Sequence, residues 1–182
     1  MNKRQIVQKT IGIVILVGIV LLIGFAALRM YTKSFSPEAI STYQNENISI
    51  EVKYCQPHKK GRVIFGNLVS YGEIWRTGAN EATVVKFSDD VLINDKVLNA
   101  GKYSLFTIPD KNNWTVIFNE QTGQWGTMYK EKRDILRVDV SPEHSKEVQE
   151  VFTIDLTGED QNVTMTLHWD KTRISIPIEV LQ

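Results

Sequence analysis

The chain has 182 residues, which suffices for one ordinary domain and an appendage but not for two full domains. Four of its 21 basic residues and none of its 21 acidic residues lie in the first 30 positions, so residues 31–182 hold 17 basic against 21 acidic groups, a net charge of −4. Binding to nucleic-acid phosphates requires a basic surface, so this charge excludes nucleic acid as a partner. The single cysteine, Cys55, excludes an intrachain disulfide and is expected to face solvent or a partner.

The N-terminal region contains a long apolar run. Residues 10–28 carry no charge and consist mainly of Ile, Val and Leu. As a helix, this run is roughly 28 Å long, close to the hydrocarbon thickness of a bilayer. It is apolar on every side, as contact with lipid requires. We therefore predict a transmembrane signal-anchor helix over residues 10–30, which contacts the bilayer through residues 10–28.

The charges that flank this run indicate its orientation. Three basic residues precede it and two follow it closely: Lys3, Arg4 and Lys9, then Arg29 and Lys33. The positive-inside bias places residues 1–9 in the cytoplasm and the rest of the chain outside it, in the periplasm or the extracellular space. A cleaved signal peptide is the alternative, although its apolar region is usually shorter. Both alternatives place the domain in the same compartment.

The remainder of the chain reads as a tether followed by a β domain. Residues 31–46 are polar and show no strong period, which predicts a tether, and the domain is expected over residues 47–182. Alternation of apolar and polar residues then predicts strands. The predicted strands comprise residues 48–54, 83–88, 91–93, 96–98, 103–108, 114–119, 135–140, 151–156, 163–169 and 174–180.

About nine short strands without a convincing amphipathic helix are typical of an all-β protein. We therefore predict an antiparallel β-sandwich of about nine strands, preceded by the transmembrane helix. One short surface helix is possible over Pro142–Glu147.

One stretch, Gly66–Ala82, breaks the alternation and combines three glycines with two aromatic and several charged residues. Long connections inside compact domains are often functional. In a ligand cleft, an aromatic ring of this stretch would stack on an apolar face of the ligand while polar side chains fix its orientation. A second loop, residues 121–126, offers another tryptophan. The candidate ligand-binding residues are Tyr71, Trp75, Arg76, Asn80, Glu81 and Trp125.

Two other interpretations of the same stretch remain open. In the structural one, Arg76 pairs with Glu73 or Glu81 and pins the loop, while Trp75 lies in the core. In the catalytic one, Glu73 and Glu81 are the two carboxylates of a glycoside hydrolase. The spacing of the two residues in the sequence does not give the distance between their carboxylates.

Other chemistries have little support in the sequence. The histidines, His58, His144 and His168, show no HxH or HExxH spacing, so we expect no metal site. There is no GxSxG, GxxxxGK or GxGxxG motif, so we expect neither a nucleophile elbow nor a nucleotide, and no cofactor.

Three stretches resemble a bacterial family of secreted or envelope proteins known as domain-of-unknown-function family 2911. They are residues 61–66 (GRVIFG), 71–82 (YGEIWRTGANEA) and 100–109 (AGKYSLFTIP). The resemblance extends from about Ser49 to Ile178 and includes Trp114 and the run Gln124-Trp125-Gly126. It implies an extracytoplasmic domain and carries no established activity. Relatives often have proline where this chain has Ser70.

These observations favour a membrane-anchored, extracytoplasmic β-sandwich that binds a ligand or a protein of the cell envelope. The first alternative is an envelope hydrolase that acts on a carbohydrate-like polymer through Glu73 and Glu81. The second is a purely structural or assembly subunit without a small ligand.

Overall fold

The computed structural model describes residues 2–181, which divide into a unit that ends at Phe35 and a unit that begins at Ser36. The first unit is the helix α1 (Lys3–Phe35), whose large apolar side chains from Val7 onward are exposed. It is the one helix among the described residues that is long and apolar enough to cross a membrane, and the predicted span lies inside it. Met1 and Gln182, which begin and end the predicted segments, lie outside the described residues.

The prediction of a tether over residues 31–46 is wrong. The helix α1 extends to Phe35, and β1 (Glu38–Gln44) follows after two residues and pairs with β2 (Ser49–Cys55). The second unit therefore begins at Ser36 rather than Asn47. The prediction missed β1 because an edge strand buries its inner face only partly, so its alternation is weak.

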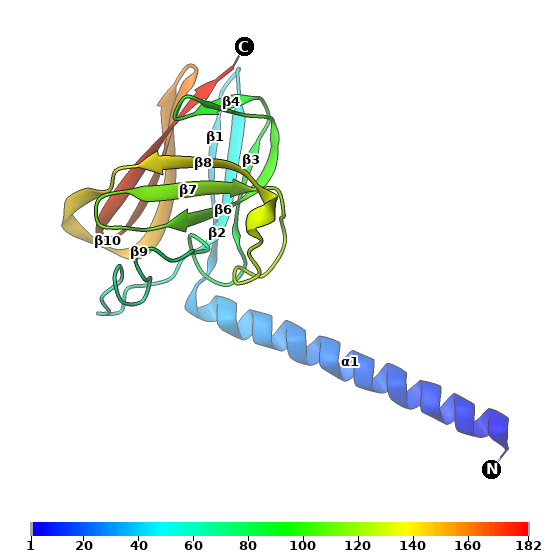
Figure 1. The fold of residues 1–182 in the computed structure, drawn as a ribbon. Helices are drawn as coiled ribbons and strands as arrows, with labels where there is room; N and C mark the ends of the chain where they lie inside the picture. Colours follow the sequence, from blue (N-terminus) through cyan, green and yellow to red (C-terminus); the bar gives the residue numbers. More distant parts are fainter. Residues whose placement is uncertain (1, 182) are drawn as a thin grey trace. The chain divides into compact units, whose positions relative to one another are not determined.

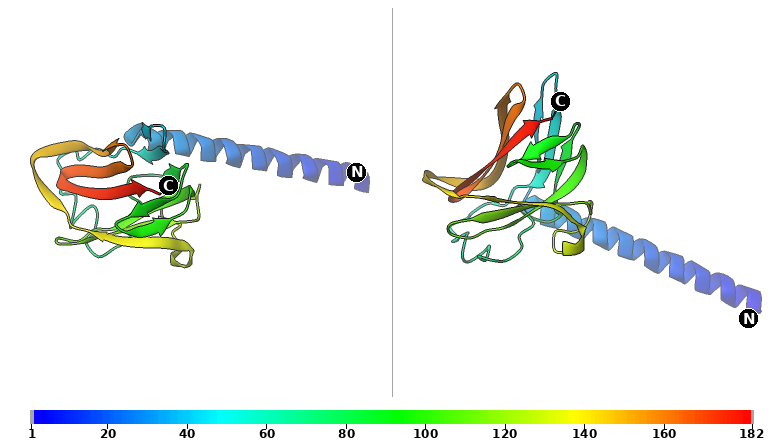
Figure 2. Two further views of the ribbon diagram at one scale, coloured as in Figure 1. Left: turned by 90° about the horizontal axis from the view of Figure 1, so that it is seen from above. Right: turned by 45° about the horizontal axis from the view of Figure 1, so that its top comes forward.

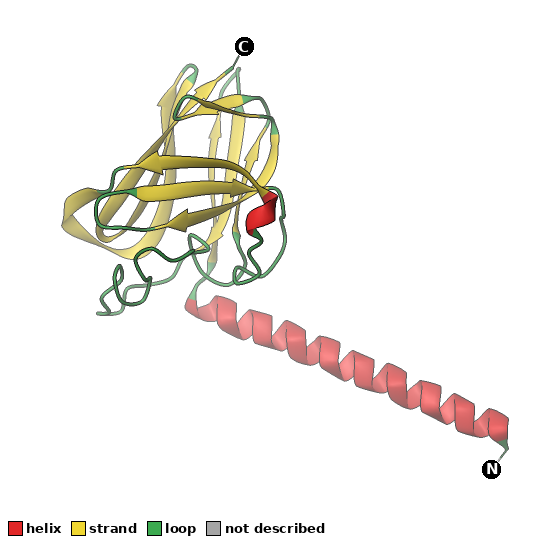
Figure 3. Cartoon of the chain, viewed as in Figure 1, coloured by secondary structure: helices red, strands yellow, loops and turns green. Residues whose placement is uncertain are grey.

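Within residues 2–181, ten strands form the two antiparallel sheets of a sandwich, in agreement with the predicted fold class (Figures 1 and 3). One sheet has the order β1-β2-β3-β6-β7-β8 and the other has the order β5-β4-β10-β9. In Figure 2, the paired strands β9 and β10 of the second sheet are seen in orange and red. The remaining bounds are β3 (Thr83–Phe87), β4 (Val91–Ile93), β5 (Lys96–Leu98), β6 (Gly101–Ile108), β7 (Trp114–Asn119), β8 (Asp134–Val140), β9 (Glu143–Glu159), β10 (Asn162–Val180) and a short 3-10 helix, η1 (Glu131–Arg133).

The main core lies between the two sheets and contains the inward-facing residue of each alternating pair. In β7, for example, Val116 and Phe118 are fully buried in this core, as are Met165 and Ile176 of β10. A fully buried aliphatic or aromatic side chain contributes about 1.5–3 kcal/mol through removal from water. This alternation is why the strand predictions for most of the domain were correct.

Two predicted elements differ near the C-terminus. The possible helix over Pro142–Glu147 is instead the beginning of β9, because β10 provides an extended backbone for pairing, as at Glu143 with Arg173. The two strands predicted over residues 163–180 are a single bent strand with irregular pairing around Asp170, whose φ is +54°. A bulge lets the strand bend without ending.

The outer face of the six-stranded sheet carries a second, smaller apolar cluster. Its buried members are Ala82, Phe106 and Ile117, and the ring of Tyr129 lies 4.9 Å from that of Phe106. Cys55 also lies on this side and is buried, so the expectation that it faces solvent or a partner is wrong. Loops thus cover part of this outer face.

Candidate functional site

The long connection between β2 and β3 is held against both sheets. His58 forms a backbone bridge with Val151 of β9, and Trp75 forms one with Thr107 of β6. In the second bridge both backbone hydrogen bonds are made, at 2.7 and 2.9 Å. The stretch singled out in the sequence therefore continues the sheet beyond β3 instead of forming a loose loop.

Trp75 lies in the core. Its side chain is 8% exposed, and its ring stacks on Trp169 at a centroid distance of 5.9 Å and an interplanar angle of 16°. Its indole N–H donates to the carbonyl of Gly78 at 3.2 Å. The ring also makes T-shaped contacts with Phe65, Trp114 and Phe152. The structural interpretation therefore fits this residue, which anchors the segment.

The backbone is strained at residue 77, two residues after Trp75. Thr77 has a φ of +52° although it is β-branched, and its side chain is fully buried. Such a conformation costs of order 1–3 kcal/mol and persists only where the surroundings enforce it. Here the hydroxyls of Thr77 and Thr107 lie 3.1 Å apart, and the Thr83 hydroxyl donates to the Thr77 carbonyl at 2.6 Å. Arg76 is thus held between two fixed neighbours.

Arg76 is half-buried, and its side chain lies over Gly126. A Cβ added to Gly126 would overlap Cδ of Arg76 and would lie 2.7 Å from its Cβ. The guanidinium makes one hydrogen bond to another described residue, from Nη1 to the Asn80 carbonyl at 3.4 Å. Burial lowers the pKa of this guanidinium below its ordinary value. Among the described residues, Arg76 forms no ion pair. The pairing with Glu73 or Glu81 that the structural interpretation invokes is therefore not formed.

The Arg76 side chain lines an open groove of about 380 Å³. One part of the lining is apolar and the other is polar. The lining residues are Leu68, Val69, Ser70, Glu73, Ile74, Trp75, Arg76, Gly126, Thr127 and Tyr129. A partly desolvated cation with an apolar wall beside it is suited to a ligand that carries an anionic group. We refer to this hollow as the Arg76 groove.

A hydrogen-bonded network holds Tyr129 at the edge of the groove. Its hydroxyl donates to the Asp134 carboxylate at 2.6 Å and accepts from Arg137 at 2.9 Å. Arg137 also donates to Asp134 at 2.7 Å, and the buried Asn119 amide donates to the other Asp134 oxygen at 2.7 Å. These bonds leave Tyr129 little freedom to turn.

The network predicts a loss of stability at alkaline pH. Burial and the hydrogen bond to Asp134 raise the pKa of Tyr129 to about 12. An unfolded tyrosine titrates near about 10. The folded state therefore retains the proton longer, so this stabilisation is complete below about pH 10 and is lost between about pH 10 and 12. Between these pH values, the free energy of unfolding should fall less steeply for Tyr129→Phe, which keeps the ring contact with Phe106, than for the wild-type chain. Equal slopes for the variant and the wild type would contradict the assignment of this pH dependence to Tyr129.

Three of the predicted ligand residues build the wall behind the groove. Backbone pairing joins Glu81 to Trp125, and the amide of Gly126 donates to the Asn80 carbonyl at 3.0 Å. The Asn80 side chain donates to the carbonyl of Ser36 at 3.3 Å. The two loops that look separate in the sequence are therefore neighbours, and the backbone of these residues supports Arg76.

Tyr71 lies at a different hollow. This one has a volume of about 200 Å³, and Lys111 and Trp114 also line it. The ammonium of Lys111 is 6.0 Å from the centre of the Tyr71 ring. Of the six predicted ligand residues, only Trp75 and Arg76 line the Arg76 groove.

The two candidate catalytic carboxylates have different surroundings. Glu73 is exposed and lines the Arg76 groove. Glu81 is half-buried, and its Oε2 lies 3.9 Å from Sγ of Cys55. Among the described residues, no three His, Cys, Asp or Glu side chains form a group that could hold a metal ion.

Comparison with known proteins gives one assignment. Residues 36–178 match the model of a family described as "Protein of unknown function (DUF2911)". The chain belongs to this family. No curated protein sequence matches it, and no solved structure does. The start of the match at residue 36 agrees with the start of the second unit and with β1 as part of the family domain.

In this member of the family, sequence reasoning missed several residues that line the groove. Leu68 and Ile74 are exposed apolar residues within the stretch that was singled out, and Thr127 and Tyr129 follow the second loop directly. For Thr127 and Tyr129, the one signal in the sequence was their position shortly after Trp125. The requirement for glycine at residue 126 is set by Arg76, which is distant in the sequence.

Proposed function

We propose that the chain is a membrane-anchored binding module of the cell envelope, with its domain outside the cytoplasm, and that the Arg76 groove binds a ligand that carries a carboxylate or a phosphate. The apolar helix α1 supports the anchor. The excess of basic residues before the apolar run supports the orientation, because positive residues favour the cytoplasmic side.

The proposal for the ligand rests on the few hydrogen bonds and the partial burial of the Arg76 guanidinium. Its guanidinium has five N–H donors and never loses its charge in practice, yet one 3.4 Å bond is all that it makes to the described residues. Partial burial has already removed part of its water, as the lowered pKa reflects. A carboxylate or a phosphate could accept two parallel hydrogen bonds from it.

The other residues that line the groove indicate which further chemical groups the ligand carries. Leu68 and Ile74 offer apolar surface, while Glu73, Thr127 and Tyr129 offer polar atoms. A ligand with an apolar body, one anionic group and a few hydroxyl or amine groups fits this lining. The strained, fully buried Thr77 beside Arg76 supports a functional role, because backbone strain gathers at binding sites.

A thermal-shift assay on the full chain in detergent tests this proposal. Carboxylate-bearing and phosphate-bearing sugars are expected to raise Tm in a saturable way. Loss of a hydrogen-bonded charge is worth about 1.5–3 kcal/mol, so Arg76→Gln should lower the affinity roughly 10- to 100-fold. Arg173→Gln, at an exposed arginine of β10, is the matched control and should leave the affinity unchanged. An equal effect of both variants would contradict the proposal.

A hydrolase at the same groove is the second candidate, because Glu73 lines the groove beside Arg76. In this case Glu73→Gln would abolish turnover of a bound polymer fragment while the affinity for the anion remains. The role of a structural subunit is the third candidate, and the burial of Trp75 favours it. It requires that Arg76→Gln change neither the affinity nor the Tm response to any anion in the panel.

A further inference from the structure

The connection between β2 and β3 carries an unusual concentration of exposed apolar side chains. Val63 is 62% exposed, Leu68 46%, Tyr71 36% and Ile74 40%. We refer to these four residues as the apolar tip. Contiguous exposed apolar surface on a soluble domain marks a contact site. Leu68 and Ile74 line the same groove, and the amide of Leu68 donates to the Val63 carbonyl, so these three members of the tip are neighbours.

The apolar tip is rigidly supported. Between its members, Ile64 is fully buried and Phe65 packs its ring against Trp114 at 4.9 Å. The backbone closes on itself through bonds from Gly66 to Val69 at 2.8 Å and from Val69 to Ile64 at 2.9 Å. The tip therefore keeps its apolar side chains in solvent because the core beneath fixes the turn.

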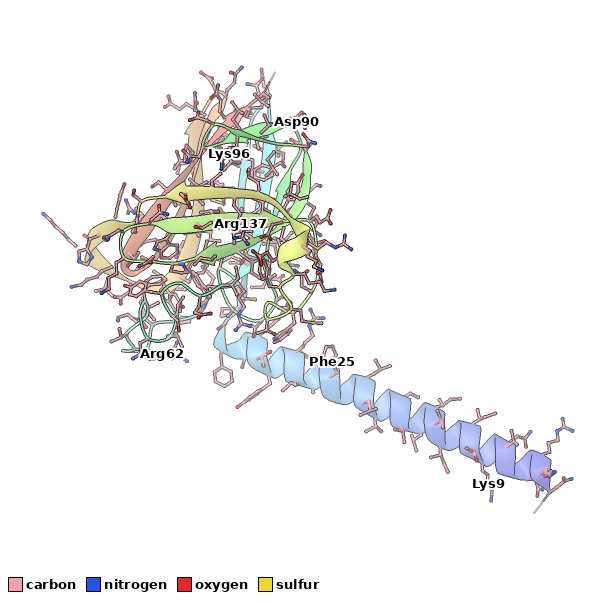
Figure 4. The ribbon with its side chains drawn as sticks, in the orientation of Figure 1. Lys9, Phe25, Arg62, Asp90, Lys96 and Arg137 are labelled. Carbon is pink, nitrogen blue, oxygen red and sulfur yellow. The ribbon has the colours of Figure 1, made fainter. Side chains whose placement is uncertain are left out.

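The connection lies at the end of the domain where β1 begins. The amide of Gln56 donates to the carbonyl of Pro37 at 2.8 Å, and the Asn80 side chain donates to the carbonyl of Ser36 at 3.3 Å. Both ends of the segment that bears the tip are thus bonded to the start of the domain. Figure 4 shows Arg62 among the loops at this end and Asp90 at the opposite end.

The length of the chain keeps this end close to a membrane. Only Ser36 and Pro37 separate α1 from β1, and two residues span at most about 7 Å. If residues 10–28 fill the hydrocarbon layer, the last seven helical residues, 29–35, rise about 10 Å above it. The polar layer of one leaflet is roughly 5–8 Å thick. The domain therefore begins at the outer edge of the headgroups.

Aromatic and basic residues occur at the part of the chain that would lie at the level of the lipid headgroups. Near the end of α1, the rings of Tyr31 and Phe35 lie 5.0 Å apart, and aromatic residues favour the membrane interface. Residues 58–76 contain four basic residues and one acidic residue, in a domain with an acidic net charge. Lys59 is paired with Asp170 at 3.0 Å, whereas the guanidinium of Arg62 donates to the carbonyls of His58 and Lys59. Carbonyl partners leave the charge of Arg62 available to an anionic headgroup.

We infer that the apolar tip docks into the interface of the bilayer that holds α1, with Arg62 at the level of anionic headgroups. Apolar side chains with adjacent cations bind such surfaces through buried area and charge together. The inference rests on the membrane anchor proposed above and not on the identity of the ligand in the Arg76 groove. One consequence is that the groove, whose rim includes Leu68 and Ile74, opens close to the membrane surface.

Depth-dependent quenching of a fluorophore tests this docking in the full chain. We would reconstitute Val63→Cys and Val97→Cys, each in a Cys55→Ser background, into liposomes with or without phosphatidylglycerol. Val97 is the matched control because it is 58% exposed and lies in β5, away from the tip. A lipid nitroxide near the headgroup should quench a label at residue 63 several-fold more strongly than one at residue 97, and more strongly with the anionic lipid.

Two results would overturn the docking. The first is equal quenching at both positions, which would place the tip in water and leave a protein as its partner. The second is unchanged quenching at residue 63 after Leu68→Asp with Ile74→Asp, substitutions at exposed sites that should reduce it toward the control value. Failure of the anchor itself is recognised separately, because the wild-type chain would then leave the liposomes in a carbonate wash.

Discussion

Replacement of Trp75 by alanine is expected to lower the free energy of unfolding by about 3–5 kcal/mol, the usual cost of removing a buried large aromatic side chain. Its ring contacts four other aromatic rings, those of Phe65, Trp114, Phe152 and Trp169. The substitution also removes the hydrogen bond to the carbonyl of Gly78, which closes the turn that contains Arg76. Denaturant unfolding of the full chain in detergent, followed by the far-ultraviolet signal of the sheets, measures this loss.

Tyr71→Ala is the control for this experiment. Tyr71 belongs to the same connection but is 36% exposed, so its loss should cost less than about 1 kcal/mol. A small cost for Trp75→Ala, together with a large loss of ligand affinity, would instead show that Trp75 contacts the ligand directly. This outcome would favour the stacking role over the core role.

Gly126→Ala is expected to destabilise the domain by about 1–3 kcal/mol, as inserted atoms do in a packed site. The new methyl would overlap the Arg76 side chain and lie 2.9 Å from the backbone oxygen of Asn80. Arg76 would have to leave its position, so affinity for anions should fall together with stability. Denaturant unfolding and the thermal-shift assay measure the two effects on the same preparation.

A double-mutant cycle separates the overlap with the Arg76 side chain from the overlap with the backbone. Arg76→Ala removes Cδ but keeps Cβ, so it relieves part of the crowding. The Gly126→Ala and Arg76→Ala double variant should therefore be more stable than the sum of the single effects predicts. Strict additivity would show that the two residues do not compete for space.

Alternation in the sequence is sufficient to predict most of the sandwich. The segments around Val116 and Met165 bury one face against the opposite sheet, so a period of two is imposed on them. The edge strand β1 and the start of β9 lack this signal, since little of either is buried. They are strands because a neighbouring backbone pairs with them, and sequence periodicity does not report such pairing.

Composition alone located part of the candidate groove. The composition of Gly66–Ala82 drew attention to Arg76, and the structure places this residue at a groove. The pairing of residues 80–82 with residues 124–126 could not be predicted, because it depends on how two loops meet over the outer face of a sheet. The same juxtaposition places the backbone of Asn80 and Trp125 behind the groove, and their contact with a ligand stays a prediction.

The most direct measurement is the ¹⁵N-edited NMR signal of the Arg76 Nε–H, with the full chain in nanodiscs and the signal assigned through Arg76→Lys. Titration with phosphate-bearing and carboxylate-bearing sugars should shift this signal along a saturable curve and leave that of Arg173 unchanged. An Arg76 signal that stays constant with every anion, or that moves only in parallel with Arg173, would contradict an anion-binding groove in this domain.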